Sequence, residues 1–261
     1  MKLIDTHTHL YLPDFSNDID EIMQKALEAG VQEFFLPAID SSETSALFEL
    51  ERRFPGKCYA MAGLHPCSVK ENYKTELDKV LGLLQERSFA AIGETGLDFY
   101  WDKTFVKEQY ESLAVQAEWA LQYNIPIVLH TRNATQETID TVRPYSKKGL
   151  TGIFHCFSGT AEQAKEITDM NFYLGIGGVI TYKNSGLAEI IKETDLANVV
   201  LETDAPYLTP VPFRGKRNES SYLKFVVEKI ADLKKISPEQ VADITTRNAQ
   251  KIFAKTLSGA V

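Results

Sequence analysis

Cysteine is scarce in this chain, with three residues among 261, Cys58, Cys67 and Cys156. An odd number without CxxC spacing predicts reduced thiols and excludes a disulfide framework. Long hydrophobic runs are also missing, since no segment approaches the roughly 18 apolar residues of a membrane helix. The opening MKLIDTHTHL lacks the basic and apolar regions of a signal peptide. We therefore expect a cytoplasmic protein that does not bind a membrane.

Positive charge is in short supply as well. The chain has 28 Lys and Arg against 36 Asp and Glu, which gives a formal net charge of −8. This balance argues against a protein that wraps duplex nucleic acid by bulk charge. It leaves room for a local basic patch or for a metal site that binds phosphate. The remaining composition, 44% hydrophobic and 25% charged, is that of an ordinary globular protein.

Short β-rich runs alternate with longer amphipathic stretches along the whole chain. The expected strands cover residues 3–8, 31–38, 58–64, 89–94, 125–130, 150–155, 172–177 and 199–203. Helices are expected between them, among others at 17–29, 103–123 and from 237 to about 257. Eight such units predict an α/β protein, a (β/α)8 TIM barrel forming a single domain over residues 1–261. A doubly wound open sheet is the alternative, but residues 5–12 lack the Gly-rich loop that it requires.

Every histidine of the chain lies at the end of one of these strands or directly after it. His7 and His9 end the first strand, His65 the third, His130 the fifth and His155 the sixth. Catalytic residues of a barrel gather at the carboxyl ends of its strands, so the five imidazoles should converge on one rim. Residues two apart on a strand point to the same side, which lets His7 and His9 reach one ion. The pattern predicts a metal site.

Two acids join the histidines at the same rim. Glu94 ends the fourth strand and Asp204 the eighth, and a buried acid is costly unless it is paired or bound to a metal. A carboxylate can hold two ions where an imidazole holds one, so Glu94 is the expected bridge, and Asp204 can also take a proton from attacking water. We expect two divalent ions, one on His7, His9, Glu94 and Asp204, the other on Glu94, His130 and His155. Imidazole ligands favour Zn²⁺, Mn²⁺ or Fe over Ca²⁺ and leave Mg²⁺ open.

The motifs DTHTHL, GLHP, GETGLDF, PIVLHTRNA, FHCFSG and ETDAPYL with GKRNE occur in this order. From Asp5 to about Glu219 the series resembles that of the TatD-type metal-dependent deoxyribonucleases of the amidohydrolase superfamily. The resemblance implies a TIM-barrel hydrolase with a two-metal site on the six ligands named above. It also implies that His65 contacts substrate phosphate and that Arg132 faces substrate. One departure is Ser220, where the family usually has proline after the Asn-Glu pair.

The fourth strand separates this chain from other members of that superfamily. Many amidohydrolases that cleave amides or phosphotriesters bridge their metals with a carboxylated lysine, and no lysine lies between Arg87 and Lys103. The bridge expected here, Glu94, therefore favours the deoxyribonuclease branch. The hypothesis is two-metal hydrolysis of DNA phosphodiesters, as an exonuclease on single-stranded or frayed ends.

Candidate substrate contacts follow the eighth and fourth strands. Three cations lie close together after the eighth, Arg214, Lys216 and Arg217, and could bind phosphate. Bases could stack on aromatic residues near the same strand ends, which are Tyr207, Phe99, Tyr100 and Trp101. Asp98 is either a hydrogen-bond partner of a ligating histidine or a turn residue.

Two other functions remain open at this point. The same dinuclear site would serve an amidohydrolase-type ester or amide hydrolase, such as an aminoacyl-tRNA deacylase. A metal-binding protein without catalytic activity is the other possibility. The sequence implies no obligate protein partner.

Overall fold

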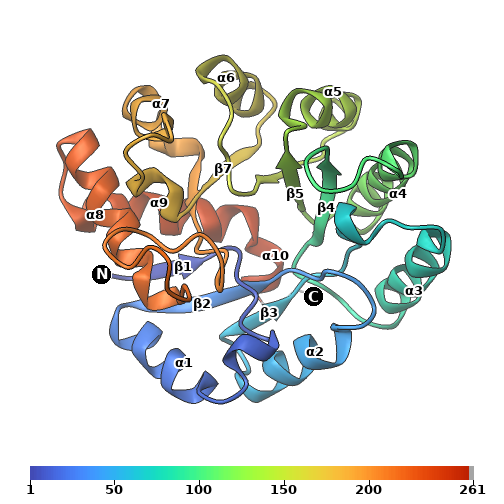
Figure 1. Cartoon of the computed structure of the whole chain (residues 1–261), viewed down its shortest axis with the longest axis horizontal. Helices are drawn as coiled ribbons and strands as arrows, with labels where there is room; N and C mark the ends of the chain where they lie inside the picture. The colour runs from blue at the N-terminus through green and yellow to red at the C-terminus, as the bar shows by residue number, and fades with distance from the viewer. Residues whose placement is uncertain (259–261) are drawn as a thin grey trace.

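Short buried strands and amphipathic helices alternate in the computed structural model, which describes residues 1–258 (Figure 1). The strands are Leu3–Asp5 (β1), Val31–Leu36 (β2), Cys58–Ala60 (β3), Ile92–Asp98 (β4), Ile127–Arg132 (β5), Gly152–Phe154 (β6), Tyr173–Ile176 (β7) and Val199–Leu201 (β8). The helices are Ile19–Glu28 (α1), Thr44–Arg53 (α2), Tyr73–Glu86 (α3), Val106–Tyr123 (α4), Thr135–Ser146 (α5), Ala161–Asp169 (α6), Leu187–Glu193 (α7), Leu223–Lys234 (α8), Pro238–Ile252 (α9) and Ala254–Leu257 (α10).

All paired strands run parallel, in the orders β1-β2-β3 and β4-β5-β6-β7-β8. Two contacts join these sheets into one barrel. A parallel bridge pairs Ala62, after β3, with Ile92 of β4. On the other side the Thr6 amide donates to Leu201 O of β8 at 3.0 Å. Helices surround the strands (Figure 1), and the expected (β/α)8 barrel is confirmed.

Local sequence explains why these elements form. Ile127, Val128 and Leu129 of β5 are fully buried, as expected for a parallel strand covered on both faces. Helix α9 begins as the sequence indicates, because the Ser237 side chain accepts from the Gln240 amide in a capping box and Pro238 occupies the first helical position.

Several element boundaries differ from the expectation. β1 ends at Asp5 rather than at Thr8, and β4 continues past Glu94 to Asp98. The last helix is interrupted at Phe253, which separates α9 from α10. The interruption places the Phe253 ring against Phe35 of β2, with the ring centroids 3.7 Å apart.

The floor of the barrel, at the amino ends of the strands, is apolar and is covered by α9. Phe253 and Phe35 belong to a buried cluster with Ile4 and Val200. From α9, Thr246 Oγ1 donates to Lys2 O at 2.9 Å. Asn248 Nδ2 donates to Val199 O at 2.8 Å. The helix therefore spans the seam between the first and the last strand.

Among the described helices, none is both long and apolar enough to cross a bilayer.

Candidate metal centre

The carboxyl ends of the strands form the mouth of the barrel. The carboxylate of Glu94 lies at the centre of this mouth and is surrounded by imidazoles. All five histidines of the chain have a ring nitrogen within 4 Å of one of its oxygens. The nitrogen–oxygen distances are 3.1 Å for His7, 3.7 Å for His9, 3.4 Å for His65, 2.9 Å for His130 and 3.8 Å for His155. Glu94 is 2% exposed, so this negative charge depends on its neighbours for compensation.

The two oxygens of Glu94 face different groups. Oε2 faces Nε2 of His7 and of His9, whereas Oε1 faces Nδ1 of His130 and Nε2 of His155. Asp204 Oδ1 lies 3.5 Å from His9 Nε2 and 3.7 Å from the Nε2 atoms of His7 and His155. Ligand atoms around one tetrahedral zinc ion are about 3.4 Å apart. These distances fit metal coordination, and Glu94 belongs to two candidate groups of ligand atoms, one with His7 and His9 and the other with His65 and His130. Another group joins His155 to His7 and Asp204.

The outer nitrogen of His9 is held by a tyrosine. Nδ1 lies 2.9 Å from the Tyr11 hydroxyl, which donates its own proton to Pro37 O at 2.6 Å. Nδ1 must then carry the imidazole proton, and the lone pair of a neutral ring remains on Nε2. That lone pair faces two carboxylates, a repulsive contact unless a cation lies between them. The donor set of His9 thus fits a metal ion.

The outer nitrogen of His130 is held in the same way, by the carboxylate of Asp98 instead of a tyrosine hydroxyl. Its Nε2 lies 2.8 Å from Asp98 Oδ2, which leaves Nδ1 to face Glu94. Asp98 Oδ1 also accepts the amides of Tyr100 and Trp101, each at 2.9 Å. Asp98 therefore fills both roles considered from the sequence, as histidine partner and as turn residue.

His155 is supported by Glu202, a fully buried acid of the segment after β8. Its Nδ1 lies 3.0 Å from Glu202 Oε1, which also accepts the Cys156 amide at 2.5 Å. Gly175 of β7 makes room for this carboxylate, because a Cβ atom there would overlap it. The negative charge favours a proton on Nδ1 and leaves the His155 Nε2 lone pair for the mouth.

His65 is oriented in the opposite sense. Its Nδ1 accepts the Cys67 amide at 3.0 Å, so a neutral ring carries its proton on Nε2, the atom that faces Glu94. His65 therefore presents a hydrogen-bond donor to the mouth. This separates it from His9 and His130, in agreement with the different role that the resemblance implies.

Electrostatics at the mouth reflect the same crowding. Burial raises the pKa of Glu94, but the neighbouring His65, His7 and His155 outweigh it and hold that pKa well below the usual range. Burial lowers the pKa of His155, yet Glu202, Glu94 and Asp204 raise it to about 10. Protons and metal ions therefore compete for the same imidazoles.

Backbone hydrogen bonds fix the ends of β1 and β8 against each other. Although β1 ends at Asp5, the chain stays extended, with Thr8 N bonded to Phe35 O and His9 N to Ala205 O. The Asp204 amide donates to His7 O at 2.9 Å. These bonds bring His7 and His9 together with Asp204, with the two histidine Nε2 atoms 3.3 Å apart.

Asp5 ties the residue that departs from the family pattern to the same strands. Its buried carboxylate accepts both the hydroxyl and the amide of Thr203, and also the hydroxyl of Ser220 at 2.6 Å. Burial raises the pKa of Asp5 to about 7, against the opposing effect of these bonds. Ser220 thus supplies a hydrogen bond that a proline could not.

Of the residues expected to contact substrate, several are exposed, but Arg217 is already engaged in an ion pair. Arg214 and Lys216 are exposed in the loop after β8, and Tyr207 is 52% exposed beside His9. Arg132 is exposed at the end of β5. Arg217 binds both oxygens of Asp18, at 3.0 and 2.5 Å, so its charge is committed to holding the loop against the start of α1.

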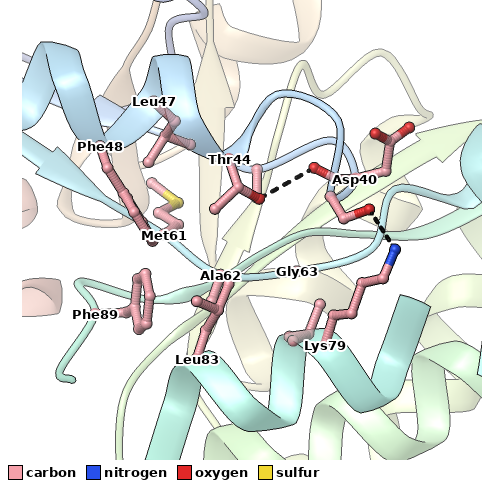
Figure 2. Close-up of a pocket in the computed structure, with 13 residues that line it drawn as sticks. Asp40, Thr44, Leu47, Phe48, Met61, Ala62, Gly63, Lys79, Leu83 and Phe89 are labelled. Carbon is pink, nitrogen blue, oxygen red and sulfur yellow. Dashed lines mark hydrogen bonds between the residues drawn. The ribbon is translucent and has the colours of Figure 1, made fainter. Parts of the chain in front are cut away.

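A narrow apolar cleft lies between α2 and α3, away from the histidines (Figure 2). Leu47 and Phe48 line it on one side, and Lys79 closes its polar edge by donating to Ser41 Oγ at 2.9 Å. None of the five histidines lines this cleft. The cleft and the histidine cluster at the barrel mouth are therefore separate features.

Comparisons with known proteins identify the family of this chain. The family described as TatD related DNase matches residues 4–254. The chain belongs to the TatD family of metal-dependent hydrolases. YabD of Bacillus subtilis, described as an uncharacterized metal-dependent hydrolase, is 38% identical over 252 residues, which cover 96% of this chain and 98% of YabD.

Two further relatives bear on fold and activity. A protein of Salmonella typhimurium described as the 3′-5′ ssDNA/RNA exonuclease TatD is 31% identical over 96% of this chain and 98% of its own. The crystal structure of YjjV, a TatD homologue of Escherichia coli, superposes with a TM-score of 0.91 at 28% identity and covers 97% of this chain and 98% of YjjV.

Proposed function

We propose that this hydrolase cleaves phosphodiester bonds of DNA, as an exonuclease on single-stranded ends, with two divalent ions at the barrel mouth. The observation that carries the proposal is the position of Glu94, whose two oxygens face separate groups of imidazole nitrogens. His7, His9, Glu94 and Asp204 would hold one ion, and Glu94, His130 and His155 the other. When bound, such ions polarise water and neutralise phosphate charge.

The chain's own residues supply the remaining roles. Asp204 would accept a proton from attacking water. His65 presents its Nε2 proton to the mouth, where it can donate to a phosphate oxygen. Arg214, Lys216 and Arg132 lie exposed around the mouth and would bind neighbouring phosphates, whereas Arg217 fixes the loop. The Salmonella typhimurium relative supports a single-stranded substrate.

The test starts from metal-stripped protein reloaded with Mg²⁺, Mn²⁺ or Zn²⁺. Single-stranded DNA labelled at its 3′ or its 5′ end is the substrate, and wild type is compared with Glu94→Gln and Asp204→Asn. Glu86→Gln, a change at an exposed acid of α3, is the matched control. We expect stepwise shortening by wild type and the control but not by the two site variants.

Two results would overturn the proposal. Equal cleavage by wild type and Glu94→Gln would place the activity outside this site. Turnover of a lactone, amide or aminoacyl ester without any phosphodiester cleavage would assign the same centre to another hydrolase reaction.

A further inference from the structure

Exposed aromatic side chains gather at the barrel mouth. Within residues 1–258, three aromatic residues are mostly exposed, and all three follow strands that end there: Tyr100 and Trp101 after β4, and Tyr207 after β8. Trp101 is 73% exposed and Tyr100 50%, whereas the second tryptophan of the chain, Trp119, is 9% exposed. Leaving an indole in water forgoes the burial that usually stabilises it, which suggests that Trp101 contacts a ligand.

The loop that carries Trp101 is fixed to the metal centre. Asp98 accepts the amides of Tyr100 and Trp101 with one oxygen and faces His130 with the other. The Arg132 guanidinium stacks on the Tyr100 ring at 4.7 Å. The Trp101 ring meets that of Tyr100 edge to face, with centroids 4.9 Å apart. We call Tyr100, Trp101 and Arg132 the Trp101 platform.

We propose that the Trp101 platform is a nucleobase subsite, on which the base next to the scissile phosphodiester stacks. The proposal rests on the nuclease function proposed above and specifies how that site selects its substrate. A flat ring and a neighbouring phosphate are the two features that an exposed indole beside a guanidinium recognises. A loop held in place by Asp98 keeps the entropic cost of binding low.

The subsite accounts for a preference for single strands. A base in a duplex is already stacked between its neighbours, so only an unpaired base is free to lie on Trp101. The contact is to the face of the ring, which every base has, and therefore carries little sequence selectivity. Substrate selection by strandedness would then come from the loop after β4 rather than from net positive charge, which this chain lacks.

The kinetic test compares Trp101→Ala, Trp101→Phe and wild type on two substrates. One is a single-stranded oligonucleotide and the other is an oligomer of abasic tetrahydrofuran phosphodiesters, which has no aromatic ring to stack on Trp101. We expect Trp101→Ala to lose about 5- to 150-fold in kcat/KM on the oligonucleotide, the range of one base stack. On the base-free oligomer kcat/KM of Trp101→Ala should differ little from that of wild type, and Trp101→Phe should recover part of the loss on the oligonucleotide.

An abasic oligonucleotide identifies the contact. Removing the base next to the cleaved bond should slow wild type about as much as Trp101→Ala does, and the two changes together should cost no more than either alone. Equal kcat/KM for wild type and Trp101→Ala on the intact oligonucleotide would overturn the subsite. A Trp101→Ala defect that persists in full on the abasic substrate would do the same.

Fluorescence separates the subsite from the nuclease function. A phosphorothioate oligonucleotide, which resists hydrolysis, should quench the tryptophan emission of wild type but not of Trp101→Phe, because Trp119 is buried. Quenching without hydrolysis of any oligonucleotide would support the subsite and reject the nuclease. Hydrolysis without quenching would support the nuclease and reject the subsite.

Discussion

At the floor of the barrel Phe253 stacks on Phe35 among apolar side chains, whereas at the mouth Glu94 and Asp204 lie among five histidines. The same parallel strands supply both ends. Burial of apolar rings stabilises the fold wherever it occurs, while burial of acids and imidazoles is costly unless each is compensated. The floor therefore holds the barrel together, and the mouth uses that stability to keep a charged site in place.

A change at Glu94 tests whether the mouth determines activity and the floor determines stability. It should have the largest effect on activity. Glu94→Gln removes the charge shared by both expected ions, so metal content should fall and kcat/KM should drop by about 10²- to 10³-fold or more. Metal analysis and phosphodiester assays measure these effects. The free energy of unfolding of the metal-free protein, measured in denaturant with a chelator, should change less than in the floor variant described next.

Phe253→Ala is the corresponding change at the floor. It leaves a cavity against Phe35 and should lower the free energy of unfolding by about 3–5 kcal/mol. The kcat per folded molecule should stay at the wild-type value, since no mouth residue moves. Phe253→Leu, which refills most of the volume, serves as the control and should cost less. A large loss of kcat in folded Phe253→Ala would show that the two ends are not independent.

A smaller effect is expected from a residue that acts on the mouth without facing it. Tyr11→Phe removes the oxygen that holds His9 Nδ1, and metal affinity should fall by about 10- to 100-fold. Competition with a chelator of known affinity measures the change. Tyr207→Phe removes a hydroxyl near the same histidine and should leave metal affinity unaltered. Equal losses in the two variants would contradict the positioning role of Tyr11.

The smallest effect concerns the loop after β8. Arg217 hydrogen bonds lower the pKa of Asp18, so the pair stabilises the protein above the ordinary carboxyl pKa. That contribution is lost as the pH falls through the lowered pKa. Asp18→Asn should therefore be less stable than wild type by up to about 1 kcal/mol at neutral pH, and the two should converge in acid. Asp14→Asn, at a neighbouring exposed acid, is the control, with stability followed by thermal unfolding across pH.

The fold and the convergence of the histidines follow from the sequence because they depend on regular spacing. Strand ends recur along the chain, and every histidine lies at or directly after one. Because the carboxyl ends of barrel strands meet at one rim, the sequence predicts that His7 and His155 lie close together. In the structure the four histidines expected as ligands have a ring nitrogen within 4 Å of Glu94, and Asp204 lies within 4 Å of three of them.

The hydrogen bonds and ion pairs of individual side chains join residues that are far apart in the chain. Sequence spacing does not reveal such pairs. Arg217 pairs with Asp18 across 199 positions, so a cation that the sequence leaves free for phosphate is engaged elsewhere. The role of Tyr11 is not visible in the sequence, because it depends on the hydrogen bond that its hydroxyl donates to Pro37 O. Glu202 lies two residues before Asp204, so the sequence shows an acid near the site. Its contact with His155 also requires the space that Gly175 leaves for the carboxylate.

The contacts of α9 have a consequence for synthesis on the ribosome. β1 is translated early, yet its neighbours across the seam are β8 and α9, whose Thr246 and Asn248 bond to Lys2 and Val199. The nascent chain therefore exposes the open edge of β1 until β8 and α9 have been made. The protein should depend on chaperones during this interval more than its final stability would suggest.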